Sequence, residues 1–404
     1  MRKSSLFVGA LTVLAFLGCN SGSYGEYETI TASDIEEIGD LTKIAYDFKI
    51  HALKSDDPLD GIGGVKSWGD VMLARTSDDR KILRFDNYKL TSVLDHLGRG
   101  PGEYYYIEDF SYDKVNNCIY IENDSNLVTY DANTMDFIGK QPLNISIQNC
   151  LNLGDKMLYF GVYSDERGLR AVDDVIKVPY YSMIIVDRDE RDLKKGTVLY
   201  RENYLQRVFF GYPELFYVNP KNYSTCLTGF VNRIVTFNDL KEVTDVYRFR
   251  LGNEPIPADV EAIFESEELP GDGLNDALNA ISKSINESTI MVNNVYNIMV
   301  DGDNISFRVM YMCRDESYGP SSQYLYFVRS DNKTKVYKHL RIPGLALDVD
   351  PTGANGNHQI AIIENLGDMA IDESEPMSEL AEQILAELKK QNDDNPVMLE
   401  FRFK

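Results

Sequence analysis

One Gly/Pro-rich stretch decides the fold of this chain, and it consists of His96-Leu97-Gly98-Arg99-Gly100-Pro101-Gly102-Glu103-Tyr104-Tyr105-Tyr106-Ile107-Glu108-Asp109-Phe110. Three glycines and a proline lie within five residues, between two runs in which apolar and polar side chains alternate. Pro101 fixes its own φ and keeps the preceding residue out of the α region, while the glycines can adopt positive φ. The stretch therefore predicts a rigid looping connector between two β-sheets, with Arg99 and Glu103 paired across it.

A strand–turn–strand unit recurs along the rest of the chain. In each copy a run of β-branched or aromatic residues ends at a polar turn and a second strand follows; the turns contain Asp86, Asp131, Asp187, Asn238 and Asn332. Asp and Asn accept turn conformations, and the flanking residue types prefer a pleated, half-buried surface. The first four turns are 45, 56 and 51 residues apart. Such spacing suits four-stranded propeller blades of about 40–50 residues with loop insertions.

Two parts of the chain have helical spacing instead. The segment over about residues 255–287 predicts two short helices on the outside or rim of a blade. The helix-breaking residues Pro270-Gly271-Asp272-Gly273 separate them. Near the C-terminus, one apolar helical face is formed by Met377, Leu380, Ala381, Ile384, Leu385 and Leu388. Both helical parts are expected as additions to a β-propeller.

The last residues alternate again. Every second residue from Val397 to Phe403 is a large apolar one, which predicts a half-buried strand. Its natural partner is the N-terminal segment Ile44–Ile50, because a blade made from both termini removes the open edge of the ring. Five hairpins and this composite blade predict six blades in all.

A family resemblance rests on Gly98–Tyr104, Asp109-Phe110, Asn117–Ile121 and Asn395–Leu399. Together these segments resemble the six-bladed β-propeller lipoproteins that are abundant in Gram-negative anaerobes. The resemblance covers nearly the whole mature chain, and its Gly-x-Gly-Pro-Gly-Glu segment is the specific part. It implies an all-β, six-bladed propeller with short helical insertions and a C-terminal helix before the closing strand, in an outer membrane location. It implies no particular activity.

The N-terminus predicts export. A basic start, an apolar run from Leu6 to Phe16 and the ending Leu17-Gly18-Cys19 form a secretory signal that is too short to span a membrane. Leu-Gly-Cys resembles a lipobox, so Cys19 is the expected lipidation site and the only membrane anchor. The resulting division is a signal peptide over residues 1–18, a tether over 19–40 and one propeller domain over 41–404. Outward-facing lipoproteins often have an acidic run directly after this cysteine, which Asn20–Ser23 lacks, so the periplasmic and surface faces of the outer membrane both stay open.

Composition restricts the partners. Removing residues 1–18 takes away Arg2 and Lys3 and no acid, so the formal charge changes from −23 to −25. A surface this acidic excludes nucleic acid and anionic lipid head groups as expected partners. The chain has 26 tyrosines and one tryptophan, and exposed tyrosines would suit a glycan or a peptide, although most are expected in the core.

Motifs for catalysis or metal binding are weak. The glycine-rich connector lacks the strand–loop–helix setting of a phosphate-binding loop. Asp348–Asn355 matches a calcium loop only in part, because Gln359 stands where a bidentate Glu is needed. No catalytic residue, metal site or cofactor is therefore expected. The four histidines are dispersed along the chain, at His51, His96, His339 and His358. The cysteines after Cys19 are expected mainly as buried free thiols, and disulfides between them stay open; they are Cys118, Cys150, Cys226 and Cys313.

The sequence therefore predicts a lipid-anchored envelope propeller that binds or scaffolds a glycan, peptide or protein partner. The alternative is an envelope hydrolase or lyase with its site in the axial channel, because propellers host both kinds of function. The expected role of Gly98, Arg99, Gly100, Pro101, Gly102 and Glu103 is structural, as a connector between blades.

Overall fold

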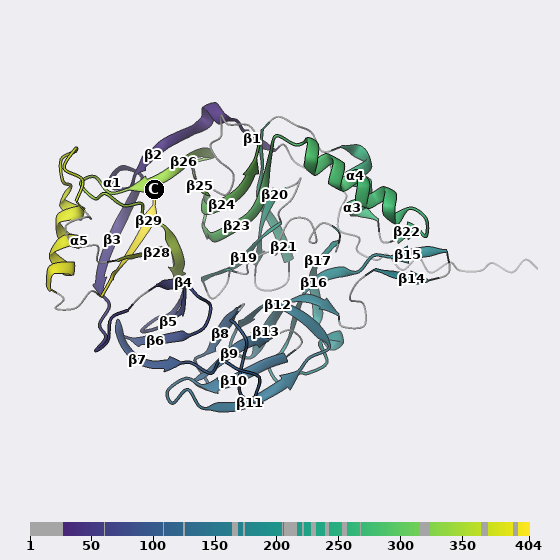
Figure 1. Cartoon of the computed structure of the whole chain (residues 1–404), viewed down its shortest axis with the longest axis horizontal. Coiled ribbons are helices and arrows are strands. Elements are labelled where there is room, and N and C mark those ends of the chain that lie inside the picture. The colour runs from purple at the N-terminus through teal and green to yellow at the C-terminus, as the bar shows by residue number, and fades with distance from the viewer. Residues whose placement is uncertain are drawn as a thin grey trace, which may run out of the picture.

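The computed structural model describes residues 27–59, 61–107, 109–123, 126–163, 169–172, 174–203, 205, 216–219, 222–227, 232–238, 242–252, 257–266, 268–314, 324–364, 371–390 and 395–404. This part of the chain forms six four-stranded antiparallel blades around a central axis (Figure 1). The all-β, six-bladed propeller predicted from the sequence is confirmed.

The first three blades follow one another along the chain, each from its inner strand to its outer one. Blade 1 contains β4 (Ile62–Trp68), β5 (Val71–Thr76), β6 (Ile82–Asp86) and β7 (Lys89–Leu94). Blade 2 contains β8 (Phe110–Asp113), β9 (Cys118–Asn123), β10 (Asn126–Asp131) and β11 (Phe137–Pro142). Blade 3 contains β12 (Ile145–Asn152), β13 (Lys156–Tyr163), β16 (Tyr180–Asp187) and β17 (Thr197–Asn203), with the short 3₁₀ helix η2 (Leu193–Lys195) before β17.

The remaining blades complete the ring. Blade 4 contains β18 (Phe216–Asn219), β19 (Asn222–Leu227), β20 (Asn232–Asn238) and β21 (Glu242–Leu251). Blade 5 contains β23 (Ile290–Asp301), β24 (Asn304–Cys313), β25 (Tyr324–Ser330) and β26 (Lys333–Arg341). Blade 6 contains β27 (Pro351–Asn355), β28 (His358–Ile363), β29 (Val397–Phe403) and β3 (Ala45–Ala52).

The repeated Asp or Asn turn joins the third and fourth strands in blades 1 to 5. In blade 5, Ser330 pairs with Lys333 across Asp331 and Asn332, whose φ angles are 51° and 60°. Two consecutive positive φ values are the conformation of a type I′ turn, which matches the twist of the flanking strands. The hairpins predicted from these turn residues are confirmed.

Blade 6 closes the ring with both ends of the chain. Its third strand, β29, pairs antiparallel with β3, so that Leu399 lies opposite Ile50. The closure predicted from the terminal alternation is confirmed. The innermost strand β27 also pairs in parallel with β4 of blade 1, where a Cβ added to Gly353 would lie 1.9 Å from the carbonyl oxygen of Val65. Blades 6 and 1 therefore form one continuous eight-stranded sheet.

Residues 28–40 of the expected tether over 19–40 pair with the propeller, whereas residues 19–26 lie outside the described residues. β1 (Glu28–Ile30) adds a fifth, parallel strand to β21, and β2 (Ile35–Asp40) adds one to β26. Between them lies the 3₁₀ helix η1 (Ala32–Asp34), and the single-turn helix α1 (Leu41–Ile44) leads into β3. The alternating runs in this segment are too short to be recognised as strands from the sequence. The strands that they pair with lie more than 200 residues away along the chain. The predicted signal peptide and Cys19 lie outside the described residues.

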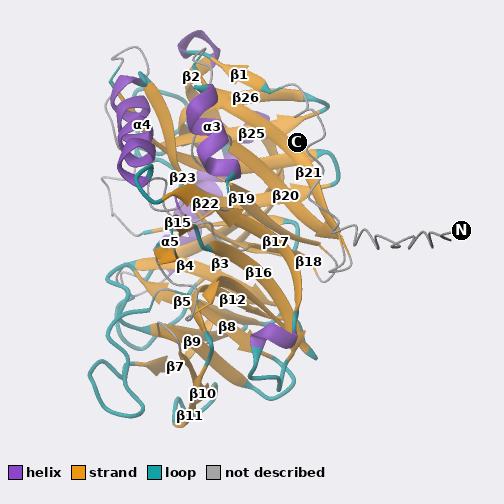
Figure 2. Ribbon diagram, turned by 90° about the vertical axis from the view of Figure 1, so that its right-hand side faces the viewer, coloured by secondary structure: helices purple, strands orange, loops and turns teal. Residues whose placement is uncertain are grey.

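The helical insertion and the C-terminal helix are present where the sequence predicts them. The insertion contains α3 (Ala258–Glu265) and α4 (Leu274–Glu287), and β22 (Glu268–Pro270) between them joins a small sheet with β14 (Arg170–Val172) and β15 (Val175–Lys177) from blade 3. Figure 2 shows α3 and α4 at the opposite end of the molecule from β7 and β11. Helix α5 (Glu379–Lys390) buries Leu380, Ala381, Ile384, Leu385 and Leu388 against blade 6.

Apolar side chains fill the spaces between neighbouring blades. Between blades 4 and 5, the ring of Phe249 lies 5.1 Å from Phe307 and 5.0 Å from Phe327, measured between ring centroids. All three side chains are buried. The blades are therefore held together by face-to-face packing, which positions their loops as fixed surfaces.

Candidate functional site

The predicted connector joins the outer strand of blade 1, β7, to the inner strand of blade 2, β8. The loop is closed by backbone hydrogen bonds from Gly98 to the Tyr104 carbonyl and from Tyr104 to the His96 carbonyl, at 3.0 and 3.1 Å. The Glu103 carboxylate turns inward and accepts a hydrogen bond of 2.6 Å from the Gly100 N–H. A Cβ on Gly98 would lie 2.0 Å from Glu103 Oε2, so glycine is required to make room for this carboxylate.

The expected pairing of Arg99 with Glu103 is wrong. Arg99 instead donates from Nε to the Tyr105 hydroxyl, and its guanidinium carbon lies 5.1 Å from the centre of the Tyr105 ring. The physical reason is that Glu103 satisfies a backbone donor inside the loop, where a carboxylate forms a charge-assisted hydrogen bond. Arg99 is therefore free to stack on an aromatic ring at the surface.

Gly102 lies at the contact between the connector and blade 2. A Cβ added there would lie 2.6 Å from Phe137 Cγ, and the Tyr130 hydroxyl donates to the Gly102 carbonyl at 3.2 Å. Gly102 is not among the glycines with positive φ. Gly102 therefore does not use the positive φ that a glycine can adopt, and close approach to Phe137 explains this glycine instead.

Tyr104 anchors the connector in the core. Its side chain is fully buried, and its hydroxyl donates to the Arg80 carbonyl at 2.8 Å and accepts from the His96 N–H at 3.3 Å. Burial is the main reason that the pKa of Tyr104 is raised to about 12. The next two tyrosines are instead exposed, so one buried ring fixes two surface rings in place.

Large apolar side chains gather on the surface around this connector. Six of the eleven exposed ones in the described chain belong to the connector, to β7 or to β11: Val93, Leu97, Tyr105, Tyr106, Phe137 and Ile138. We call this group the blade 1–2 rim surface. Tyr105 and Tyr106 are 57% and 54% exposed. The six residues belong to neighbouring elements of blades 1 and 2, and exposed apolar groups that gather on one surface mark interaction sites in soluble proteins.

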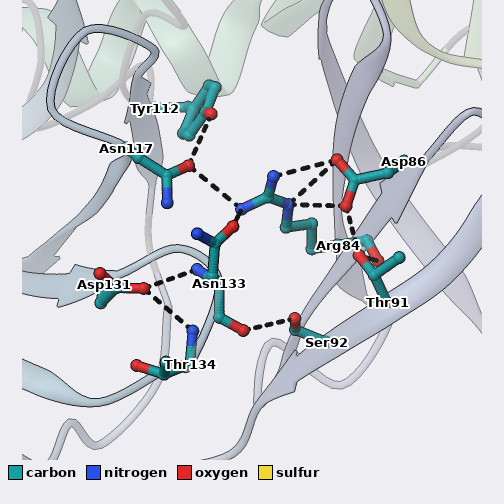
Figure 3. Close-up of polar contacts among 9 residues, drawn as sticks. All are labelled: Arg84, Asp86, Thr91, Ser92, Tyr112, Asn117, Asp131, Asn133 and Thr134. Carbon is teal, nitrogen blue, oxygen red and sulfur yellow. Dashed lines mark hydrogen bonds and ion pairs between the residues drawn. The ribbon is translucent and has the colours of Figure 1, made fainter.

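A polar cluster at the turns of blades 1 and 2 has a different role (Figure 3). Arg84 on β6 binds Asp86 of its own blade and reaches across to Asn117 and Asn133 of blade 2, at 3.2 and 2.8 Å. Burial alone would raise the pKa of Asp86, but hydrogen bonds from Thr91 and Arg84 outweigh it and lower that pKa. Arg84 is buried, so this cluster braces two blades. Arg188 with Asp113, and Arg402 with Asp301, brace other blade pairs in the same way.

A second polar cluster lies on the innermost strands. Lys66 on β4 donates to the Asp109 carboxylate and, at 2.9 Å, to the Phe110 carbonyl. Asn149 on β12 approaches the same carboxylate at 3.5 Å. Burial raises the pKa of the neighbouring Cys150 thiol well above its usual value. The cluster links the inner ends of blades 1, 2 and 3.

The two carboxylates at the start of the turn Asp348–Asn355 are held by other side chains of the protein. Asp348 lies 2.6 Å from His339 Nδ1 and accepts from Arg341 Nε at 2.9 Å. Asp350 accepts from the Tyr326 hydroxyl and lies 3.9 Å from an Arg308 nitrogen. Both carboxylates thus have partners that compete with a calcium ion.

The histidines and cysteines lie apart in the structure as well. His51 stacks on Tyr88, and His358 lies 2.8 Å from an Asp47 oxygen. Across the described residues, no group of three or more His, Cys, Asp or Glu side chains is arranged to hold a metal ion. Cys118, Cys150 and Cys313 are free thiols, of which only Cys150 is fully buried; the side chain of Cys226 lies outside the description.

Sequence reasoning missed Arg84, Lys66 and Arg308. A signal was present for two of them, because Arg84 stands between Leu83 and Phe85, and Arg308 between Phe307 and Val309. A single cation within an apolar strand run indicates a buried polar contact. The sequence gives no comparable signal for the residue in the next blade that each arginine contacts.

The sequence profile of the DUF5128 family, described as a 6-bladed beta-propeller, matches residues 24–279. The chain belongs to this family. A protein described as exported, from Bacteroides fragilis, has the same fold: it is 16% identical, with a TM-score of 0.61 over 93% of this chain and 99% of the other. A DUF4221 family member from Bacteroides vulgatus is 11% identical over 89% of this chain and 98% of its own, with a TM-score of only 0.40.

Among curated proteins, none matches the sequence significantly. In the described part of this DUF5128 chain, no helix is long and apolar enough to cross a membrane. The family relationship therefore establishes the propeller fold. A function has to be inferred from the sites described above.

Proposed function

We propose that this protein is a lipid-anchored binding and scaffolding module of the bacterial cell envelope, and that it holds a partner protein on the blade 1–2 rim surface. The observation that carries this proposal is the gathering of exposed Val, Leu, Ile, Phe and Tyr side chains on two blades. A mixture of aliphatic and aromatic residues is typical of the centre of a protein interface.

The charges beside the rim surface support a protein partner. Lys81 pairs with Asp95 at 2.9 Å, and Glu103 turns into the loop. Arg99 remains at the surface on the Tyr105 ring, and tyrosine and arginine are the residue types most enriched at interface hot spots. The surface thus combines apolar side chains with the oriented cation of Arg99, and the nearby Lys81 and Asp95 pair with one another.

The arrangement of the inner strands favours binding on the rim over chemistry on the axis. β27 is hydrogen-bonded to β4, and Cα atoms of β18 in blade 4 come within 8 Å of β27 in blade 6. Backbone therefore occupies part of the space in which the alternative, an axial hydrolase or lyase, would need a substrate channel.

The proposed anchor leaves the rim surface accessible. β1 begins at Glu28, and Figure 1 shows it on the opposite side of the ring from β7 and β11. The eight residues between Cys19 and Glu28 span at most about 29 Å when fully extended. A lipid on Cys19 would therefore tether the propeller through the blade 4 side of the ring.

The test is site-specific photo-crosslinking in cells that make the protein. A photoreactive residue at Ile138 is expected to give one discrete adduct, and Tyr105→Ser is expected to remove it. The matched control is the same photoreactive residue at Val115, which is 74% exposed on the β8–β9 turn outside the rim surface. Equal adducts at both positions, or none at Ile138, would contradict the proposal.

A further inference from the structure

The elements that form the blade 1–2 rim surface differ in charge from the chain as a whole. They are β7, the connector over residues 95–107 and β11. Their charged residues are the cations Lys89, Arg99 and Lys140 and the acids Asp95 and Glu103. Three cations against two acids give these elements a formal charge of +1, whereas the whole chain has a formal charge of −23. The rim surface is therefore a basic and apolar area on an acidic protein.

Both acids of these elements are engaged elsewhere. Asp95 pairs with Lys81 at 2.9 Å, and Glu103 turns into the connector, where it accepts from the Gly100 N–H at 2.6 Å. Within the described residues, neither carboxylate forms an ion pair with a cation of the rim surface elements. The positive charge of the rim surface is therefore not neutralised by its own acids and can attract the charge of a partner.

Arg99 presents its guanidinium group in a fixed orientation. Its Nε donates to the Tyr105 hydroxyl, and its guanidinium carbon lies 5.1 Å from the centre of the Tyr105 ring. The side chain is exposed, and its two terminal nitrogens have no acceptor in the part of the chain that the structure describes. Terminal guanidinium N–H groups form a planar fork that binds a carboxylate through two parallel hydrogen bonds.

Lys140 places a second cation on the same face of blade 2 as Phe137. These two residues pair with Val128 and Tyr130, which are two positions apart on β10 and so point to one face of the sheet. That face packs against blade 1, because Val128 and Tyr130 belong to the core between the two blades. Lys140 itself is exposed. The face that carries the exposed Phe137 ring thus also carries a cation.

We propose that the partner on the rim surface presents an acidic segment, in which an Asp or Glu side chain binds Arg99 and neighbouring apolar side chains pack on Tyr105 and Phe137. This inference rests on the proposed function and adds the chemistry by which the partner is recognised. Complementary charge speeds association and disfavours partners of the wrong charge. An acidic segment is repelled by a protein of charge −23 as a whole and attracted by its basic area, which favours this surface over others.

The test uses the purified full-length protein and an array of amidated peptides, each with aromatic and aliphatic residues around a central Glu, Gln or Lys. Peptides with Glu are expected to bind about tenfold more strongly than the matched Gln peptides, since one charge-assisted hydrogen bond has an effect of this order. The preference is expected to weaken as the ionic strength rises from about 0.01 to about 1 M, because the Debye length falls from about 30 to about 3 Å.

Arg99→Glu is expected to lose binding of the Glu peptides and to gain binding of the matched Lys peptides. The matched control is Arg191→Glu, which makes the same charge change at an exposed arginine before η2 of blade 3 and is expected to bind like the parent. Melting temperatures establish that both variants fold. The proposal is overturned by equal binding of Glu and Gln peptides, by no peptide binding, or by an Arg99→Glu variant that behaves like Arg191→Glu. Binding of phosphatidylglycerol vesicles without binding of any Glu peptide would also overturn it.

Crosslinking at Ile138 separates this inference from the proposed function. Arg99→Glu is expected to reduce the adduct at Ile138 about tenfold, and Arg191→Glu is expected to leave it unchanged. An adduct that Arg99→Glu does not alter would keep the protein partner and refute its acidic contact. The absence of any adduct in the parent protein would refute the partner itself.

Discussion

At the scale of the residue, neighbouring tyrosines in the connector have opposite tasks. Tyr104 is buried and binds two backbone groups, whereas Tyr105 is exposed and supports Arg99. The alternation of strands does not explain this difference, because both rings lie in a loop. The difference follows from the direction in which the loop presents successive side chains, and it separates a structural ring from a binding ring.

We expect Tyr104→Phe to lower the free energy of unfolding by about 1–3 kcal/mol, because the Arg80 carbonyl and the His96 N–H would lose a buried partner. Tyr105→Phe is the matched control and is expected to change stability by less than about 0.5 kcal/mol, as surface substitutions usually do. Urea unfolding of both variants measures the difference. Equal stabilities would show that the Tyr104 hydroxyl does not anchor the connector.

Gly102 gives a second test at this scale. Gly102→Ala is expected to destabilise the protein by about 1–3 kcal/mol, because the new Cβ overlaps the Phe137 ring. In the double variant with Phe137→Ala the overlap is absent, so the two costs should not add. Arg99→Ala serves as a control and should cost about 0–1 kcal/mol, since its stack on Tyr105 is exposed. Additive effects in this thermodynamic cycle would refute the contact as the reason for glycine.

At the scale of the element, the ring depends on strands from both termini. β29 is the third strand of blade 6, and its residues Val397, Met398, Leu399 and Phe401 are buried. β1 pairs with β21 through only three residues. The two terminal additions therefore differ in importance: one fills the middle of a blade and the other extends an outer edge.

Deleting residues 395–404 is expected to abolish cooperative unfolding. Each of the four buried side chains contributes about 1.5–3 kcal/mol, and their sum is comparable to the whole stability of a typical domain, about 5–15 kcal/mol. Starting the chain at residue 32 removes β1 and is the matched control, expected to keep a cooperative transition. Calorimetry of the two truncations distinguishes them, and a parent-like melt of the C-terminal truncation would contradict the closure.

At the scale of the whole molecule, the proposed rim surface and the proposed anchor occupy separate parts of the ring. β7 and β11, which carry part of the blade 1–2 rim surface, lie on the opposite side of the ring from β1 (Figure 1). A ring of rigid blades allows such separation because each gap between blades is an independent interface. Anchoring and protein binding can thus be disrupted one at a time.

Cys19→Ala tests the anchor. The variant is expected to move from the membrane fraction to the soluble fraction and to lose palmitate labelling, because no other lipid attachment is proposed. Its melting temperature should stay unchanged, since the propeller begins at β1. Membrane association and labelling that persist in the variant would exclude Cys19 as the lipidated residue.

The sequence by itself determined the blades, the connector and the closing strand, because these depend on local alternation, turn residues and chain order. Asp131 and Asn332 indicate hairpins from their own local sequence, and the alternation from Val397 to Phe403 can be recognised without any other part of the chain. Only the tertiary structure decided that Arg84 meets Asn133, that Arg308 approaches Asp350, and that Gly102 approaches Phe137. Each of these contacts joins different blades or a connector to a blade, and it depends on sheet twist and register, which no local pattern encodes.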